Sequence, residues 1–543
     1  MDKRKVLIVL ILLGIVYFLL FILPNLAGTQ DVNMLSIFEK DEFAQYPNVI
    51  RMVTPGDTFY QSIRNFSVYL HYFYGYPFYF FSAITLLPAK LVLGTSWNNQ
   101  TPLLVMILRQ MINVFPMILS VLIWVYMRTR FRSFKRALAL FLLLLFVPAV
   151  VVNDIWWHPD SLGFLFVTLT FFFLDRDEHY FGRNYLLTAV TCGIALGIKY
   201  LGMFFILVIP VYILWGVLQK KISWKRAGAM GLAFVSVMLG SVVISNPLLL
   251  LPIERGELLA TQARQFLETS KGFWFQNVLP YFQPGVYPDD FRIHYGELAF
   301  ILLALAAWLV GVIRSKSRMQ NVLIMAYLLP LVITLNNAAT HRTHYFIPVM
   351  LPLFACLVDL FPENQNIFEK FKFGFTNKMG YWASRLIMLL LVCGITLQFI
   401  GFLQEDFRIV VSALTREKTS PGIGFYQNIE QVFLSRVPAG RSLVIYRDWD
   451  IYVPSRPNWR VELNWNLADY GYIQDLKPDI ILLAQNILAL VNQPGAVNQA
   501  VNPGNMRAWQ IFYQDAAMNR LPGYQLIYQD NFGYALVKDG LFK

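Results

Sequence analysis

The sequence predicts an α-helical polytopic membrane protein that ends in a small soluble α/β domain. The 543-residue chain is 57% hydrophobic and only 14% charged, which is far from the composition of a soluble domain. Apolar runs long enough to span hydrocarbon recur from residue 6 to about residue 402. Beyond residue 402 the pattern changes to short strand-like runs separated by turn residues.

The first apolar run, residues 6–23, follows Lys3, Arg4 and Lys5 and so begins like a signal peptide. Its apolar core is longer than the roughly 7–15 residues of a signal peptide. We therefore expect a first transmembrane helix that is retained, with the N-terminus in the cytoplasm.

Basic residues determine the expected orientation of the later helices. They gather in short loops between apolar runs, as the positive-inside rule predicts for cytoplasmic loops. The most basic loops are residues 128–136, 220–226, 314–318 and 370–378. These loops account for the net charge of +12, so nucleic acid is not an expected partner.

Residues 77–94 decide whether this orientation is consistent. They are apolar enough to span, but Pro88 interrupts them, and a crossing there would place the loop 128–136 outside. A helix lying in the outer interface keeps every basic loop cytoplasmic. About eleven spanning helices follow, near residues 6–24, 103–127, 137–152, 161–174, 185–198, 201–218, 227–245, 297–313, 320–336, 345–361 and 382–402.

Two domains are expected from this pattern. Residues 1–402 form the membrane module, whose first outer loop, 25–102, contains the interfacial helix 77–94. Residues 403–543 form an extracytoplasmic α/β domain, because they contain two buried strand-like runs and a hairpin signal near residues 531–533. The three cysteines lie in apolar segments without ligand-like spacing, which argues against disulfides and thiolate metal sites.

Ionisable and aromatic residues from distant segments collect on the predicted outer side. Taken singly, each has a simpler reading, such as a solvated loop carboxylate or a lysine that snorkels from a helix end. Interfacial ionisable residues are costly, however, and their convergence on one face favours a functional site. The candidates are Asp41, Glu42, His71, Tyr74, Asp154, His158, Asp160, Lys199, His294, Arg342, His344 and Tyr345.

The order of these features resembles the GT-C superfamily of integral-membrane glycosyltransferases, in particular the group of protein O-mannosyltransferases and lipid A aminoarabinose transferases. The resemblance spans the whole chain. It consists of the acidic pair Asp41-Glu42 in a long first outer loop, the run 74–80 leading into the interfacial helix, an Asp-containing turn after the third spanning helix, a glycine-rich fifth helix that ends in Lys199, and a soluble outer tail.

The resemblance implies an inverting transfer of a hexose or pentose from a polyprenyl-phosphate donor to an acceptor hydroxyl at the outer face of a prokaryotic cell membrane. It implies Asp41 as catalytic base, with Glu42 in support. Asp160 is the best match for the second acidic position, and Asp154 is the other option.

Lys199 matches a contact of the donor phosphate in the family, and Arg342, with His344 beside it, matches a second cation more loosely. Roles in positioning donor or acceptor remain for His71, Tyr74, His158, Asp154, His294 and Tyr345. Lys40 before Asp41 and the extended His-Pro-Asp turn at 158–160 depart from the group, which leaves the fine specificity open.

The sequence leaves the need for a metal open. Mg²⁺ or Mn²⁺ would suit the carboxylates Asp41, Asp160 and Glu42. The acceptor can be a protein, a lipid or a glycan. A lipid-linked glycan ligase is an alternative, since residues 341–344 supply outer Arg and His. A lipid or sugar transporter is disfavoured, because the charges stand at helix ends and no internal repeat is present.

Overall fold

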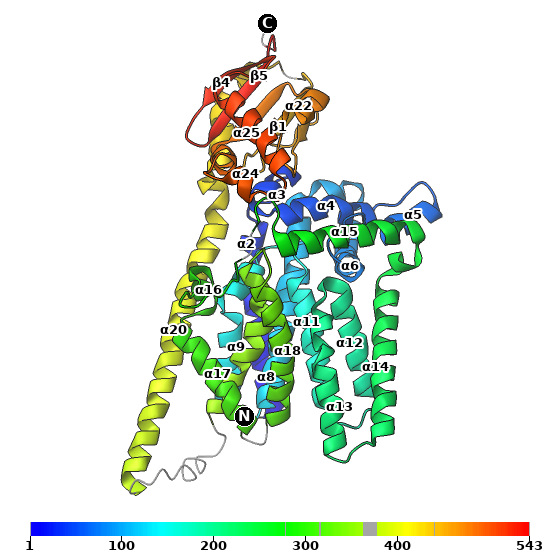
Figure 1. Ribbon diagram of the computed structural model, residues 1–543, viewed down its shortest axis with the longest axis vertical. Coiled ribbons are helices and arrows are strands. Elements are labelled where there is room, and N and C mark those ends of the chain that lie inside the picture. Colours follow the sequence, from blue (N-terminus) through cyan, green and yellow to red (C-terminus); the bar gives the residue numbers. More distant parts are fainter. Residues whose placement is uncertain (1, 277–278, 314–316, 362–376, 439, 542–543) are drawn as a thin grey trace.

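The computed structural model describes residues 2–276, 279–313, 317–361, 377–438 and 440–541. Figure 1 shows a bundle of long helices with a layer of helices across one end and a separate domain beyond that layer. The N-terminus lies at the opposite end of the bundle from the C-terminus (Figure 1). The predicted basic residues 314–316 and 370–376 lie outside the described residues.

The helices of the bundle carry most of the apolar sequence. They are α1 (Lys3–Leu20), α2 (Ile22–Leu26), α7 (Thr101–Arg109), η2 (Gln110–Val114), α8 (Phe115–Thr129), α9 (Phe134–Leu145), α10 (Pro148–Asn153), α11 (Asp160–Asp177), α12 (Arg183–Lys199), η3 (Leu201–Ile206), α13 (Val208–Leu218), α14 (Trp224–Ser245), α17 (Leu298–Ile313), α18 (Arg318–Asn336), η5 (Thr343–Phe346), α19 (Ile347–Ala355), η6 (Cys356–Leu360) and α20 (Asn377–Thr419).

Eight helical segments of the described chain are long and apolar enough to cross a membrane. A ninth is added if α16 (Asp289–Tyr295) and α17, which meet at a bend of 59°, form one broken span. The chain is therefore a multi-pass membrane protein, as predicted. The count of about eleven spans stays a prediction, because helices such as α9 and α12 run beside these segments but are shorter or more polar.

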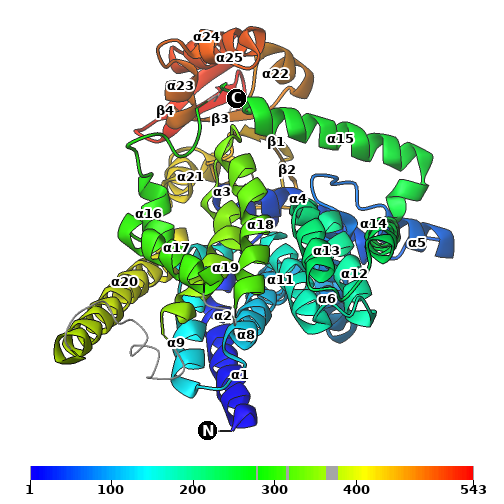
Figure 2. The same ribbon diagram turned by 60° about the horizontal axis from the view of Figure 1, so that its bottom comes forward.

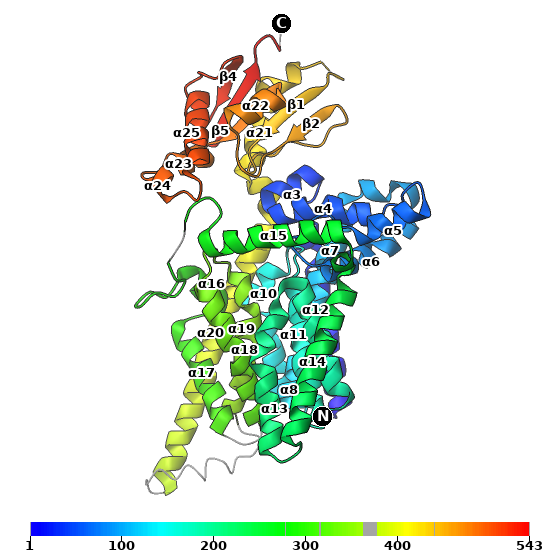
Figure 3. The same ribbon diagram turned by 45° about the vertical axis from the view of Figure 1, so that its right-hand side comes forward.

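The layer across the end of the bundle comes mostly from the first outer loop. Its helices are α3 (Val32–Phe38), α4 (Lys40–Met52), α5 (Phe59–Ser67), α6 (Tyr76–Leu93), η1 (Gly94–Asn99), η4 (Pro247–Leu250) and α15 (Pro252–Lys271). Figures 1 and 3 both place α6, the predicted interfacial helix, beside α4 and α5 in this layer. The backbone N–H of Gly75 donates to the Ile198 carbonyl over 3.1 Å, which holds the start of α6 on the end of α12.

The domain beyond the layer has a mixed five-stranded sheet of order β2-β1-β3-β5-β4. Its elements are α21 (Pro421–Val432), η8 (Leu434–Arg436), β1 (Leu443–Arg447), β2 (Trp459–Glu462), α22 (Tyr470–Leu476), β3 (Ile480–Ala484), α23 (Gln485–Val491), α24 (Ala496–Gln499), α25 (Pro503–Ala517), β4 (Tyr524–Gln529) and β5 (Gly533–Lys538). β1 pairs in parallel with β2 and β3, and β5 pairs antiparallel with β3 and β4. Every residue of β3 is buried, as expected for a central strand covered on both faces.

The predicted α/β tail and the polytopic helical class are confirmed. The predicted boundary at 402/403, however, lies inside α20, which runs unbroken from Asn377 to Thr419. Polar residues after 402 end the apolar pattern but not the helix, because Gln, Glu, Arg and Ala are favourable helix formers. The helix ends before Pro421, since a proline disfavours the helical conformation of the residue that precedes it.

Candidate functional site

Five segments that are distant in sequence meet where the layer covers the bundle. They are the start of α4, the loop before α6, the turn that leads into α11, the end of α12, and η5. The side chains that they contribute are Asp41, Tyr74, His158, Asp160, Lys199 and His344.

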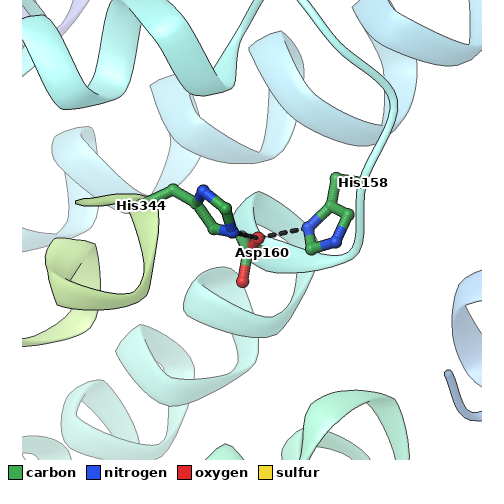
Figure 4. Close-up of side chains that lie close together, drawn as sticks. All are labelled: His158, Asp160 and His344. Atoms are coloured by element: carbon green, nitrogen blue, oxygen red, sulfur yellow. Dashed lines mark hydrogen bonds and ion pairs between the residues drawn. The ribbon is translucent and has the colours of Figure 1, made fainter. Parts of the chain in front are cut away.

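Asp160 is the centre of this group, and its side chain is 7% exposed. Its Oδ1 accepts a hydrogen bond from Lys199 Nζ at 2.6 Å, and its Oδ2 is hydrogen bonded to His158 Nδ1. The Nε2 atom of His344 lies 3.6 Å from the same Oδ2. Figure 4 shows the two histidine rings reaching Asp160 from opposite sides.

The electrostatics of the group follow from burial and close charges. Burial disfavours the Asp160 carboxylate, but His158, Lys199 and His344 together outweigh it and hold the pKa of Asp160 well below its usual range. Burial lowers the pKa of Lys199, and Asp160 offsets part of that effect. Burial also lowers the pKa of His158. The result is an ionised carboxylate that serves as the counter-ion for the mostly buried ammonium of Lys199.

Asp41 lies at the edge of this group, in the first turn of α4, where a carboxylate interacts favourably with the helix dipole. Its side chain is 51% exposed. The Tyr74 hydroxyl lies 3.5 Å from Asp41 Oδ2, and His158 Nε2 lies 3.7 Å from it. The same hydroxyl is 2.6 Å from His158 Nε2, so Tyr74 connects Asp41 to the buried group.

Glu42 points the other way from its neighbour and is fully buried. Arg109 donates to both of its carboxylate oxygens, at 2.7 and 2.6 Å, and the backbone N–H of Trp157 donates to Oε1 at 2.5 Å. Both oxygens of Glu42 are therefore engaged, which gives it a role in fixing α4 to α7 and to the turn before α11. Arg109 was missed in the sequence, although an arginine inside an apolar run signals a buried partner.

The two options for the second acidic position separate in space. Asp160 lies with Lys199, whereas Asp154 accepts a hydrogen bond from Tyr17 at 3.0 Å inside the bundle. Burial raises the pKa of Asp154 to about 8. The structure therefore places Asp160, and not Asp154, beside the other candidates.

The remaining candidates divide between the group and its surroundings. The Tyr345 ring lies under the Lys199 ammonium at 4.4 Å, and exposed Arg342 is close enough to affect Lys199 electrostatically. His71 Nδ1 lies 2.5 Å from the Tyr79 hydroxyl, next to Tyr74.

His294 lies apart on α16, where its ring hydrogen bonds to the Asp290 carbonyl at 2.6 Å. Trp156, which the sequence reasoning missed, stacks on the His158 ring at 4.2 Å and fixes its plane.

One set of side chains in the group could hold a metal ion. His158, Asp160 and His344 each offer one ligand atom, and these atoms lie within 4.8 Å of one another. The Nε2 atom of His344 is buried and has no hydrogen-bond partner among the described residues, so it is free to bind a ligand. Two imidazoles and one carboxylate suit transition ions such as Zn²⁺ better than Mg²⁺. The predicted set with Glu42 does not assemble, because Arg109 occupies that carboxylate.

The C-terminal domain holds the segment that carries Asp41. The buried Arg447 side chain donates to Ser36 Oγ at 2.7 Å, and the Tyr452 hydroxyl donates to Asp31 at 2.8 Å. Lys40, directly before Asp41, pairs with Asp450 at 3.2 Å. The domain therefore braces α3 and the start of α4 from outside.

The chain is similar to known proteins in part of its sequence and in its overall structure. Residues 100–240 match the family model of dolichyl-phosphate-mannose-protein mannosyltransferases. No curated protein matches the chain in sequence. The structure is similar to that of ArnT from Cupriavidus metallidurans bound to undecaprenyl phosphate, with a TM-score of 0.55, 11% identity, and coverage of 99% of this chain and 98% of that chain.

It is also similar to the archaeal oligosaccharyltransferase AglB from Archaeoglobus fulgidus in complex with an inhibitory peptide and a dolichol-phosphate. Here the TM-score is 0.51 and the identity 12%, with 99% of this chain and 76% of that chain covered. Both proteins are GT-C glycosyltransferases. The chain has the GT-C fold. The fold predicted from the sequence is thus confirmed, and in this GT-C fold the candidate site lies between the outer layer and the bundle.

Proposed function

We propose that this GT-C protein transfers a sugar from a polyprenyl-phosphate donor to an acceptor hydroxyl at the outer membrane face. One observation carries the proposal. A solvent-accessible carboxylate, Asp41, and a mostly buried ammonium, Lys199, both lie near the Tyr74 side chain, and Asp160 sets the position of the ammonium. The GT-C fold supports the class of donor, because the similar ArnT structure holds undecaprenyl phosphate and the AglB structure holds a dolichol-phosphate.

The geometry suits a single displacement with inversion. The acceptor hydroxyl gives its proton to Asp41, its oxygen forms a bond to the anomeric carbon, and the bond from that carbon to the phosphate oxygen breaks. A placed general base contributes about 10²–10⁴-fold to such a step. Asp41 combines the exposure needed to meet an acceptor with a position fixed by Tyr74.

Lys199 receives the negative charge that develops on the leaving phosphate. An ammonium has three N–H donors, and Asp160 takes one of them, so two remain for phosphate oxygens. Preorganised charge in a water-poor site is worth several kcal/mol, on the order of 2.7–4 for a single donor. Exposed Arg342 is close enough to Lys199 to affect it electrostatically and adds a second cation.

His158 positions the base. Because Asp160 is bound at Nδ1, the other ring nitrogen faces the Tyr74 hydroxyl, which in turn faces Asp41. A divalent cation bound by His158, Asp160 and His344 would neutralise further charge on the donor phosphate. This set replaces the carboxylate set proposed from the sequence, since it uses ligand atoms that the fold brings together.

The proposed setting is a prokaryotic cell membrane with the N-terminus in the cytoplasm. The basic loops 128–136 and 220–226 connect α8 to α9 and α13 to α14 at the end of the bundle that faces away from the C-terminal domain (Figure 1). This distribution supports a cytoplasmic position for that end and an extracytoplasmic position for the site.

A lipid-linked glycan ligase is the second candidate, because His344 joins the group around Asp160. The two functions differ in their dependence on Asp41, which a ligase of this kind would not need.

Substitution of Asp41 tests the proposed function. Asp41→Asn should lower kcat by at least about 100-fold, the lower bound for a lost general base, while polyprenyl-phosphate lipid still copurifies and is identified by mass spectrometry. Lys199→Ala should instead raise the KM for donor. Asp57→Asn, an exposed carboxylate elsewhere in the first outer loop, is the matched control and should leave both parameters unchanged. Full activity of Asp41→Asn would reject the base and favour the ligase.

A further inference from the structure

A separate cavity lies at the end of the bundle that faces away from the C-terminal domain. Its volume is about 360 Å³, which is within the range of small-molecule sites. It is formed by the ends of α8, α11 and α13 and the start of α18, whose neighbourhood Figure 2 shows from that side. None of the residues that line it belongs to the candidate site.

The inner wall of the cavity is aromatic. Trp124, Phe171, Tyr212 and Trp215 line it together with aliphatic side chains of α18. Aromatic faces attract cations, and the attraction is largest where the cation is removed from water. This wall therefore favours a ligand with a positively charged or apolar end.

Two buried acceptor atoms in the same cavity lack partners. Asp175 Oδ1 accepts from Arg130 at 2.6 Å and from Gln320 at 2.5 Å, but Oδ2 has no hydrogen-bond partner among the residues that the structure describes. The Asp175 side chain is only 8% exposed. An unsatisfied buried acceptor costs about 1–3 kcal/mol, and more if it is charged. A ligand that donates a hydrogen bond to Asp175 Oδ2 would therefore be stabilised in this cavity.

His179 presents the second atom. Its ring stacks on Tyr212 at 4.1 Å, and its Nε2 is also buried without a partner in the described part of the chain. Burial, with a contribution from Lys221, lowers the pKa of His179 to about 4, so the ring is neutral at pH 7 and can accept a hydrogen bond. Asp175 and His179 thus offer two acceptors to one ligand.

Cations stand at the mouth of the cavity. Arg130 is about one-third exposed, and Lys221 is exposed with its ammonium donating to the Glu178 carbonyl at 2.6 Å. The cavity therefore has an aromatic interior with two free acceptor atoms, and a rim on which the cations Arg130 and Lys221 outnumber the exposed carboxylate Glu178. This order of charges matches a zwitterion whose ammonium enters first and whose phosphate stays outside.

We propose that this cavity binds a phosphoethanolamine group, with the ammonium donating to Asp175 Oδ2 and His179 Nε2 and the phosphate between Arg130 and Lys221. The group can belong to a phosphatidylethanolamine headgroup or to a soluble phosphoethanolamine. A choline headgroup does not fit, because its quaternary nitrogen has no N–H to give to the two acceptors.

Native mass spectrometry of the detergent-purified full-length protein tests the proposal. Phosphatidylethanolamine should bind at least 10-fold more tightly than phosphatidylcholine of the same acyl chains. Asp175→Asn, which keeps an acceptor for Arg130 but turns Oδ2 into a donor, should remove that preference. The matched control is Asp359→Asn, a carboxylate at the same end that pairs with Arg128 and does not line the cavity.

Two further arms identify the source and guard against misfolding. Soluble phosphoethanolamine that displaces the lipid assigns the site to the headgroup alone, and failure to displace it assigns the site to the anchored lipid. If Asp175→Asn is not monodisperse, His179→Asn replaces it. Equal binding of the two lipids, or an unchanged preference in the variant that folds, would show that this cavity does not select the headgroup and would overturn the proposal. Sugar transfer should be unaffected in either variant.

Discussion

Removal of the charge on Glu42 should destabilise the whole outer layer. In Glu42→Gln the Arg109 guanidinium keeps its burial, with no exposed side-chain surface, but loses its counter-ion. The new amide also turns two N–H donors towards a group that is itself only a donor. Breaking a buried ion pair on one side costs about 3–5 kcal/mol. We expect Glu42→Gln to lower the free energy of unfolding by about that amount.

The assay is SDS titration of the protein in a mild detergent, followed by tryptophan fluorescence. Asp289→Asn is the matched control, since Asp289 pairs with Arg292 at 3.1 Å on the surface and its side chain is 84% exposed. Exposed pairs of this kind contribute less than about 1 kcal/mol. Sugar transfer should also fall in Glu42→Gln, because the same helix carries Asp41, and should not fall in the control.

A double-mutant cycle completes the test. Arg109→Met alone leaves the Glu42 carboxylate buried without its partner and should be as damaging as Glu42→Gln. The double variant removes both charges, so its loss should be smaller than the sum of the two single losses by at least about 2 kcal/mol, within the range of couplings in a shared network. A loss under 1 kcal/mol in Glu42→Gln, or strict additivity, would refute the reasoning.

Two further predictions concern protons and metal. Burial lowers the pKa of His71 to about 4, below its unfolded value of about 6.5. The unfolded chain therefore binds the extra proton first, and stability should fall as the pH drops from about 6.5 to 4. His71→Gln should flatten that decline in thermal unfolding scans, and an identical pH profile would contradict the assignment. Zn²⁺ or Mn²⁺ should restore activity after chelation. His344→Ala should weaken metal binding about 10-fold or more by calorimetry, whereas His294→Ala, which changes a histidine outside the group, should leave it unchanged. Equal metal affinity in both variants would exclude His344 as a ligand.

The sequence by itself determined the class of the protein. Long apolar runs can span a membrane only as helices, because hydrocarbon offers no partner to an exposed backbone group. The strand runs of the tail and the hairpin signal near residues 531–533 could also be recognised in the sequence, since their turn and hydrophobic patterns are local. The position of Asp41 outside the first helix, and that of Lys199 at the end of another, followed from the same apolar boundaries.

Only the tertiary structure decided what the neighbours Asp41 and Glu42 do. Successive residues of a helix point in directions about 100° apart, from 3.6 residues per turn, so one carboxylate faces the exposed edge of the site and the other enters the protein to meet Arg109. The choice of Asp160 over Asp154 also depended on packing. Both residues lie in one short turn, and only the fold brings Lys199 to Asp160. Contacts between side chains that are far apart in the sequence leave no local sequence pattern, and such contacts form the site.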